Sequence, residues 1–152
     1  IGNYPMILTK GHPGIGAQKG YRLRIEASRV VQCTVTGDTE EVAGSTKTVK
    51  EGDWWHIVGV KNSEKLKLYV NGEEWGSDDA PAGTTDNDVP LQIGRENNND
   101  WYFQGVIDDV FLFSVALSLD DIKTIMTKGF KSLADVSPSS KLAATWAYIK
   151  AK

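Results

Sequence analysis

Apolar and polar residues alternate along much of the chain in short runs, which is the pattern of β-strands that bury one face. The runs end at turn residues such as Gly37-Asp38 and Asn71-Gly72. The Asn-Gly pair predicts a tight hairpin, because both residues tolerate a positive φ. The pattern predicts strands over residues 21–27, 30–36, 54–61, 65–70, 73–75, 91–94 and 106–113. Many short strands in close succession predict an all-β, antiparallel sandwich.

Three segments depart from simple alternation of apolar and polar residues. Residues 54–61 are apolar on both faces, which predicts a central strand. Residues 38–50 are polar and predict either a loop or a solvated edge strand. Residues 76–90 predict a long polar loop.

One helix is predicted near the end of the strand-rich region. Ser118 and Asp121 have the spacing of a capping box, with Asp in place of Glu, and Gly129 suits the end of a helix. An apolar stripe at helical spacing is formed by Leu119, Ile122, Ile125 and Met126. These signals predict a helix over residues 119–128.

The tail beyond residue 130 follows no single period. Its apolar residues fit the spacing of a helix and also that of a strand. The sequence therefore predicts a sandwich over residues 1–130 and a C-terminal tail over 131–152 that is a strand or a short helix.

Length and composition restrict the class of protein. The chain has 152 residues, of which 40 % are hydrophobic and 24 % charged, as in a globular domain. A net charge of −3 argues against nucleic acid as the main partner. No apolar run reaches the length of a membrane span. A single cysteine, Cys33, excludes an intrachain disulfide and a zinc cluster made of cysteines.

Five motifs in fixed order point to a family. They are W-W-H-I-V at 54–58, K-L-K-L-Y-V-N-G at 65–72, L-Q-I-G at 91–94, F-Q-G-V-I-D-D-V at 103–110 and A-L-S-L-D-D-I at 116–122. Together they resemble laminin G-like domains of the concanavalin A-like lectin/glucanase superfamily, over residues 6–129. The resemblance implies a jelly-roll sandwich of two antiparallel sheets.

The same resemblance implies a function. Such domains recognise glycans or proteins outside the cell, often with a calcium ion, so we expect a non-catalytic extracellular module that binds a glycan or a glycosylated partner. The alternative is a structural or adhesive module that binds protein through an open sheet edge. A glycoside hydrolase is disfavoured, because the family's E-x-D-x-x-E strand is missing and the neighbouring Asp108 and Asp109 point to opposite faces.

The start of the resemblance carries a further expectation. Such domains usually have additional strands before the segment that residues 5–11 resemble. The residues from Ile1 up to this segment do not contain such strands. The chain would then be truncated or processed, completed by a second chain, or folded as a smaller sandwich. An unpaired edge would favour association.

Asp108 is the candidate metal ligand. In a strand over 106–113 it shares its side with Val106, Val110 and Leu112, and a carboxylate that faces a core needs a partner. The resemblance suggests calcium as that partner. The alternative is a structural aspartate that accepts backbone hydrogen bonds near a sheet end.

The candidate glycan site combines amide and carboxylate groups with aromatic rings. An aromatic face stacks on a sugar ring while Asn and Asp bind its hydroxyl groups. The candidates are Asn97, Asn98, Asn99, Asp100, Trp101 and Trp75. The alternative is that both tryptophans pack locally. Residues 86–88 (Asp-Asn-Asp) are a second polar loop, and His56 is expected to be structural.

Overall fold

The computed structural model describes residues 4–11, 18–96 and 101–134. The chain divides into two compact units, residues 1–112 and residues 113–152. The predicted site residues Asn97–Asp100 and most of the predicted tail lie outside the described residues. The predicted domain boundary at residue 130 stays a prediction.

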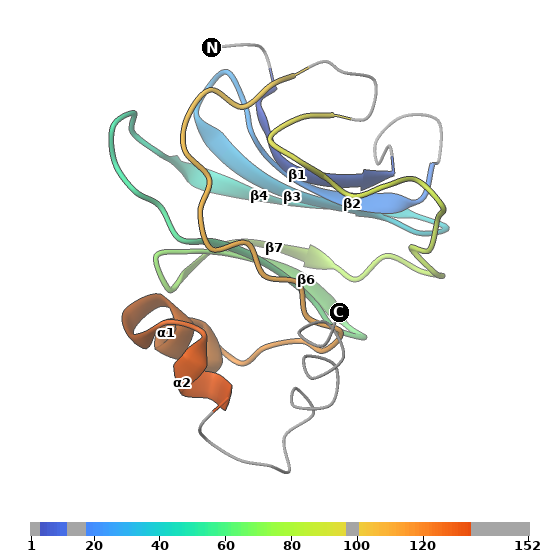
Figure 1. The fold of residues 1–152 in the computed structure, drawn as a ribbon. Helices are drawn as coiled ribbons and strands as arrows, with labels where there is room; N and C mark the ends of the chain where they lie inside the picture. The colour runs from blue at the N-terminus through green and yellow to red at the C-terminus, as the bar shows by residue number, and fades with distance from the viewer. Residues whose placement is uncertain (1–3, 12–17, 97–100, 135–152) are drawn as a thin grey trace, which may run out of the picture. The chain divides into compact units, whose positions relative to one another are not determined.

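The first unit is a sandwich of two antiparallel sheets, as predicted (Figure 1). Within the described residues, one sheet has the order β4-β3-β2-β1-β8 and the other the order β5-β6-β7. The first contains β1 (Met6–Gly11), β2 (Gly20–Ile25), β3 (Val30–Thr36), β4 (Glu40–Thr48) and β8 (Gln92–Ile93). The second contains β5 (Ile57–Lys61), β6 (Lys65–Val70) and β7 (Glu73–Asp79).

The core lies between the two sheets and is formed by alternate residues of their strands. Its buried members are Val31, Cys33, Val35, Ala43, Val49, Leu66, Leu68 and Val70. Burial raises the pKa of the Cys33 thiol to about 12, so this cysteine is a core side chain that stays protonated. Because side chains alternate along a strand, the same strands present their other residues on the outer faces.

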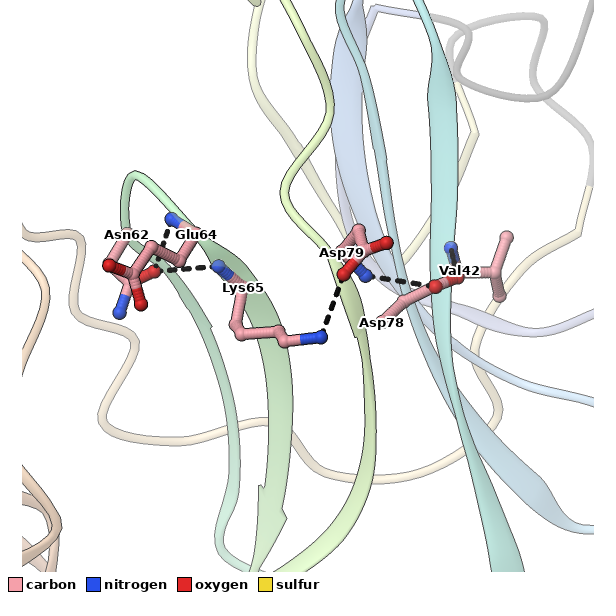
Figure 2. Close-up of polar contacts among 6 residues, drawn as sticks. All are labelled: Val42, Asn62, Glu64, Lys65, Asp78 and Asp79. Atoms are coloured by element: carbon pink, nitrogen blue, oxygen red, sulfur yellow. Dashed lines mark hydrogen bonds and ion pairs between the residues drawn. The ribbon is translucent and has the colours of Figure 1, made fainter.

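The two sheets meet along β4 and β7. Gly76 in β7 lies so close to the backbone of Gly44 in β4 that a β-carbon at position 76 would overlap the Gly44 carbonyl. Next to this contact, the Val42 backbone N–H donates to Asp78 Oδ2 at 3.1 Å, so a β7 side chain caps the outer edge of β4 (Figure 2). This side of the sandwich is closed by direct backbone contact.

The turns on either side of β6 are set by asparagines. Asn62 Oδ1 accepts hydrogen bonds from the backbone N–H groups of Glu64 and Lys65 in the β5–β6 turn (Figure 2). Asn71 and Gly72 have φ values of 50° and 75°, which confirms the predicted hairpin turn. The Asn71 side chain also accepts from the backbone N–H of His56 at 2.9 Å. Burial lowers the pKa of the His56 ring and favours its neutral form.

The second unit contains helix α1 (Leu119–Lys128) and the short helix α2 (Lys131–Ala134). The predicted bounds of α1 are confirmed, and Ser118 and Asp121 form the capping box. Two residues of the predicted stripe, Ile122 and Ile125, are buried. Residues 131–134 are helical, and the rest of the predicted tail lies outside the described residues.

Two predicted elements have other bounds in the structure, and one open alternative is decided. β5 begins at Ile57 rather than at residue 54, and it lies at the edge of the described three-stranded sheet rather than at its centre. β7 continues to Asp79, because the polar residues that suggested a loop pair with β6 and contact β4. Residues 40–48 form the solvated edge strand that was one of two alternatives.

The strand predicted over residues 106–113 is wrong. Asp109 adopts a φ of 51°, in the left-handed region, and its N–H donates to Asp108 Oδ1 at 2.9 Å. This local bond turns the backbone out of the extended conformation, and no ladder forms. The predicted inward side is exposed: Val106 is 71 % exposed and Leu112 54 %.

We predict that Gly76→Ala destabilises the protein by about 1–3 kcal/mol, because the new methyl group overlaps the Gly44 carbonyl and forces β4 and β7 apart. Urea unfolding followed by tryptophan fluorescence measures the effect. Gly44→Ala is the matched control across the same contact, since its methyl group meets only the Gln32 side chain at 3.9 Å. Equal stability of the two variants would contradict the proposed close packing.

Candidate functional site

The outer face of the five-stranded sheet carries a row of polar residues. Thr9 of β1, Arg22 of β2 and Thr34 of β3 are register partners, and all three are buried. The hydroxyl groups of Thr9 and Thr34 have no hydrogen-bond partner among the described residues. Buried polar groups in this position often hold ordered water.

The charge of Arg22 is balanced by a buried acid. Burial and the neighbouring Arg24 lower the pKa of Arg22, and the carboxylate of the fully buried Glu96 acts in the opposite direction. Glu96 follows β8, so the loop after β8 brings this acid to the polar face. A buried cation of this kind depends on the acid that faces it.

The next residue on the same side of β2, Arg24, is the centre of a hydrogen-bond network. Its Nε and Nη2 atoms donate to Gln32 Oε1 at 3.0 and 2.7 Å. Nη2 also forms an ion pair with Glu26 Oε1 at 2.8 Å. The side chains of Arg24 and Glu26 are only 14 % and 25 % exposed, so this guanidinium is held in one orientation.

Two aromatic rings extend the network to the surface. The Tyr4 ring lies over the Arg24 guanidinium, with 4.9 Å from Cζ to the ring centroid. Trp101 contacts Tyr4 edge to face, with 5.4 Å between ring centroids. We call Tyr4, Arg24, Glu26, Gln32 and Trp101 the Tyr4–Trp101 cluster.

The backbone fixes Trp101 in this place. The Met6 N–H of β1 donates to the Trp101 carbonyl at 3.0 Å, and the Phe103 N–H donates to the Gly94 carbonyl at 2.9 Å. Trp101 adopts a φ of 54°, which is unusual for a bulky residue. Strained residues of this kind are concentrated at functional sites.

The Tyr4–Trp101 cluster combines two kinds of group that can contact a ligand. It offers aromatic surface beside a guanidinium, a carboxylate and a carboxamide that are already oriented by one another. Rings of this kind stack on apolar sugar faces, and oriented polar groups bind hydroxyls without a large ordering cost.

Of the predicted glycan residues, Trp101 lies in the cluster and Trp75 lies elsewhere. Trp75 belongs to β7 and packs against the core, edge to face with Trp55 at 5.8 Å between centroids. Lys47 Nζ lies 5.3 Å from the centroid of its ring. For Trp75, therefore, the structure shows the local packing that was the alternative.

The structure also shows the surroundings of Asp108 and of the polar loop at 86–88. Asp108 is exposed, so the premise that it faces the core is wrong. No three His, Cys, Asp or Glu residues gather into a metal-holding group within the part of the chain that the structure describes. In the polar loop at 86–88, the side-chain amide of Asn87 donates to the backbone carbonyl of Lys19 at 3.2 Å. The backbone carbonyl of Asn87 accepts a hydrogen bond from Lys10 Nζ.

Sequence reasoning missed the polar members of the cluster. The signal was present in β2, where Arg22, Arg24 and Glu26 alternate with apolar residues and therefore share one face. Three charged residues on one face of a strand indicate either a solvated surface or a polar network. A solvated surface and a polar network can be told apart only from the position of the loop after β8, which carries Glu96 to the polar face of β2.

Comparison with known proteins gives the family. The family model described as "Concanavalin A-like lectin/glucanases superfamily" matches residues 3–123. The chain belongs to this superfamily. Laminin G-like membership agrees with the sandwich and with a role as a binding module. No curated protein matches the chain.

The chain is also similar to a solved structure. It is a crystal structure of an S-layer domain-containing protein (residues 221–444) from Clostridium thermocellum, with 24 % sequence identity and a TM-score of 0.42. The match covers 78 % of this chain and 63 % of that one, so the chain spans less than two thirds of the length of the solved structure. Within the described residues, the helices are all too short or too polar to cross a membrane.

We predict that Glu96→Gln destabilises this laminin G-like domain by about 3 kcal/mol, because it removes the acid that contributes most to stabilising the charge of the buried Arg22. Thermal and urea unfolding measure the loss. Glu40→Gln is the control, since Glu40 also acts on Arg22 but is exposed. A Glu96→Gln variant as stable as the control would show that Glu96 does not stabilise Arg22.

Proposed function

We propose that the chain is a non-catalytic, extracellular module that binds a glycan or a glycosylated partner at the Tyr4–Trp101 cluster. The observation that carries the proposal is the contact of Tyr4 and Trp101 beside the Arg24 network on the outer face of the sheet. Tyr102, the next residue after Trp101, is 54 % exposed and offers a second accessible aromatic ring for a ligand to contact. Membership of a superfamily of lectins and glucanases supports a carbohydrate ligand.

The cluster favours binding over hydrolysis. Retaining and inverting glycosidases need two carboxyl groups that flank the scissile bond. In the cluster, Glu26 is the acid, and its carboxylate is bound to Arg24. A carboxylate that is paired with a guanidinium suits the binding of sugar hydroxyls better than proton donation.

A glycan array with the 152-residue chain tests the proposal, followed by titration calorimetry with any glycan that binds. We predict that Trp101→Ala and Tyr102→Ala each weaken binding by about tenfold or more, because each removes an aromatic face. Trp54→Ala is the matched control, since Trp54 is 69 % exposed and comes just before β5 of the three-stranded sheet. Equal loss in the control, or no binding on the array, would contradict the proposal.

Calcium at Asp108 is a separate proposal. Asp108 and Asp109 are adjacent exposed acids, and Asp108 Oδ1 already accepts the Asp109 N–H. This donor set fits a weak site at most, so we predict that calcium raises the melting temperature only at about millimolar concentration, as for weak extracellular sites. EDTA should reverse the rise and Asp108→Ala should abolish it, with Asp120→Ala as the control. Melting that is unchanged by calcium would exclude the site.

A further inference from the structure

The Arg24 guanidinium has no edge left on which an acidic ligand could bind with two hydrogen bonds. Nη2 donates to Glu26 Oε1 at 2.8 Å and to Gln32 Oε1 at 2.7 Å, so both of its hydrogens are used. Nε donates to Gln32 Oε1 at 3.0 Å. A guanidinium holds a carboxylate, sulfate or phosphate through two parallel N–H groups, and both of the edges that offer such a pair include Nη2. The network therefore blocks the usual contact of an arginine with an anion.

The charge around Arg24 is balanced as well. Gln92 of β8 is the register partner of Thr9, and its Oε1 atom accepts from Arg95 Nε at 2.7 Å, which places Arg95 on the same face. The acids that act on the charge of the arginine at position 22 are Glu26, Glu40 and Glu96. Within the described residues, this face therefore sets three acids against three arginines, which are Arg22, Arg24 and Arg95. It offers no surplus of positive charge that would attract an anionic glycan.

The atoms that the network leaves for a ligand suit hydroxyl groups. Within the described residues, the hydrogens of Arg24 Nη1 and the Oε2 atom of Glu26 take part in none of these bonds. A sugar hydroxyl both donates and accepts, so one hydroxyl can accept from Nη1 while it or its neighbour donates to Oε2. The Glu26 side chain is 25 % exposed, which leaves its carboxylate within reach of a bound sugar.

We propose that the Tyr4–Trp101 cluster binds neutral glycans and rejects glycans that carry sulfate or carboxylate groups. This inference rests on the proposed function and names the class of ligand for the same site. The hydroxyl groups of a neutral sugar satisfy Arg24 Nη1 and Glu26 Oε2, while the rings of Tyr4 and Trp101 offer apolar surface. An acidic group would lose its water shell beside the Glu26 carboxylate and would gain only single hydrogen bonds from Arg24 in return.

A glycan array that carries neutral, sulfated and uronic-acid oligosaccharides tests the selection. We expect the chain to bind neutral members about tenfold or more tightly than sulfated or uronic members of the same backbone. Titration calorimetry at about 50 and 500 mM NaCl should give dissociation constants that agree within about twofold, because salt does not screen an uncharged ligand. A preference for acidic glycans, or an affinity that falls steeply with salt, would overturn the inference and leave the proposed function standing. An array without any bound glycan would overturn the proposed function itself, and the inference with it.

Substitution of Glu26 tests the source of the selection. Glu26→Ala frees one hydrogen of Arg24 Nη2 and leaves the guanidinium charge without its paired acid. We predict that this variant binds neutral glycans more weakly than the wild-type chain and binds sulfated glycans about tenfold or more tightly than it does. Glu40→Ala is the matched control, since it removes an equal charge from the same face, but its carboxylate bonds to Thr36 rather than to Arg24. Unchanged binding of sulfated glycans by Glu26→Ala, or an equal gain in Glu40→Ala, would contradict the role of Glu26.

Discussion

The close approach of Gly76 to Gly44 is the constraint on which the rest of the sandwich depends. It lets the backbones of β4 and β7 touch, so the sheets close on that side without side chains between them. One pair of glycines therefore sets how closely the two sheets approach on this side of the fold.

Local signals in the sequence predicted most of the elements. The bounds of β3, β6 and α1 follow from alternation, from Asn71-Gly72 and from the Ser118 capping box, all of which act over a few residues. The prediction failed at residues 106–113, whose β-branched residues suit a strand. Strand formation also needs a partner and a negative φ, and the backbone at Asp109 has a φ of 51°. Neither condition can be read from the alternation of residue types.

The candidate site was predictable only in part, because local patterns show residue types and strand faces but not long-range contacts. Trp101 was recognised by its residue type, and periodicity places Arg22, Arg24 and Glu26 on one face of β2. The pairing of Tyr4 with Trp101 joins residues almost a hundred positions apart, and it depends on the bond from Met6 to the Trp101 carbonyl. Contacts over such distances are set by the fold, so a local pattern cannot reveal them.

The polar face and the core of the sandwich arise from the same alternation of residues along the strands. In β2 it directs Arg24 outward, toward Tyr4, and Leu23 inward, toward the core. In β5 the same alternation turns Gly59 toward Cys33, at a position that has no room for a β-carbon. A residue larger than glycine would clash with the Cys33 sulfur. Core packing therefore requires glycine at this position of β5.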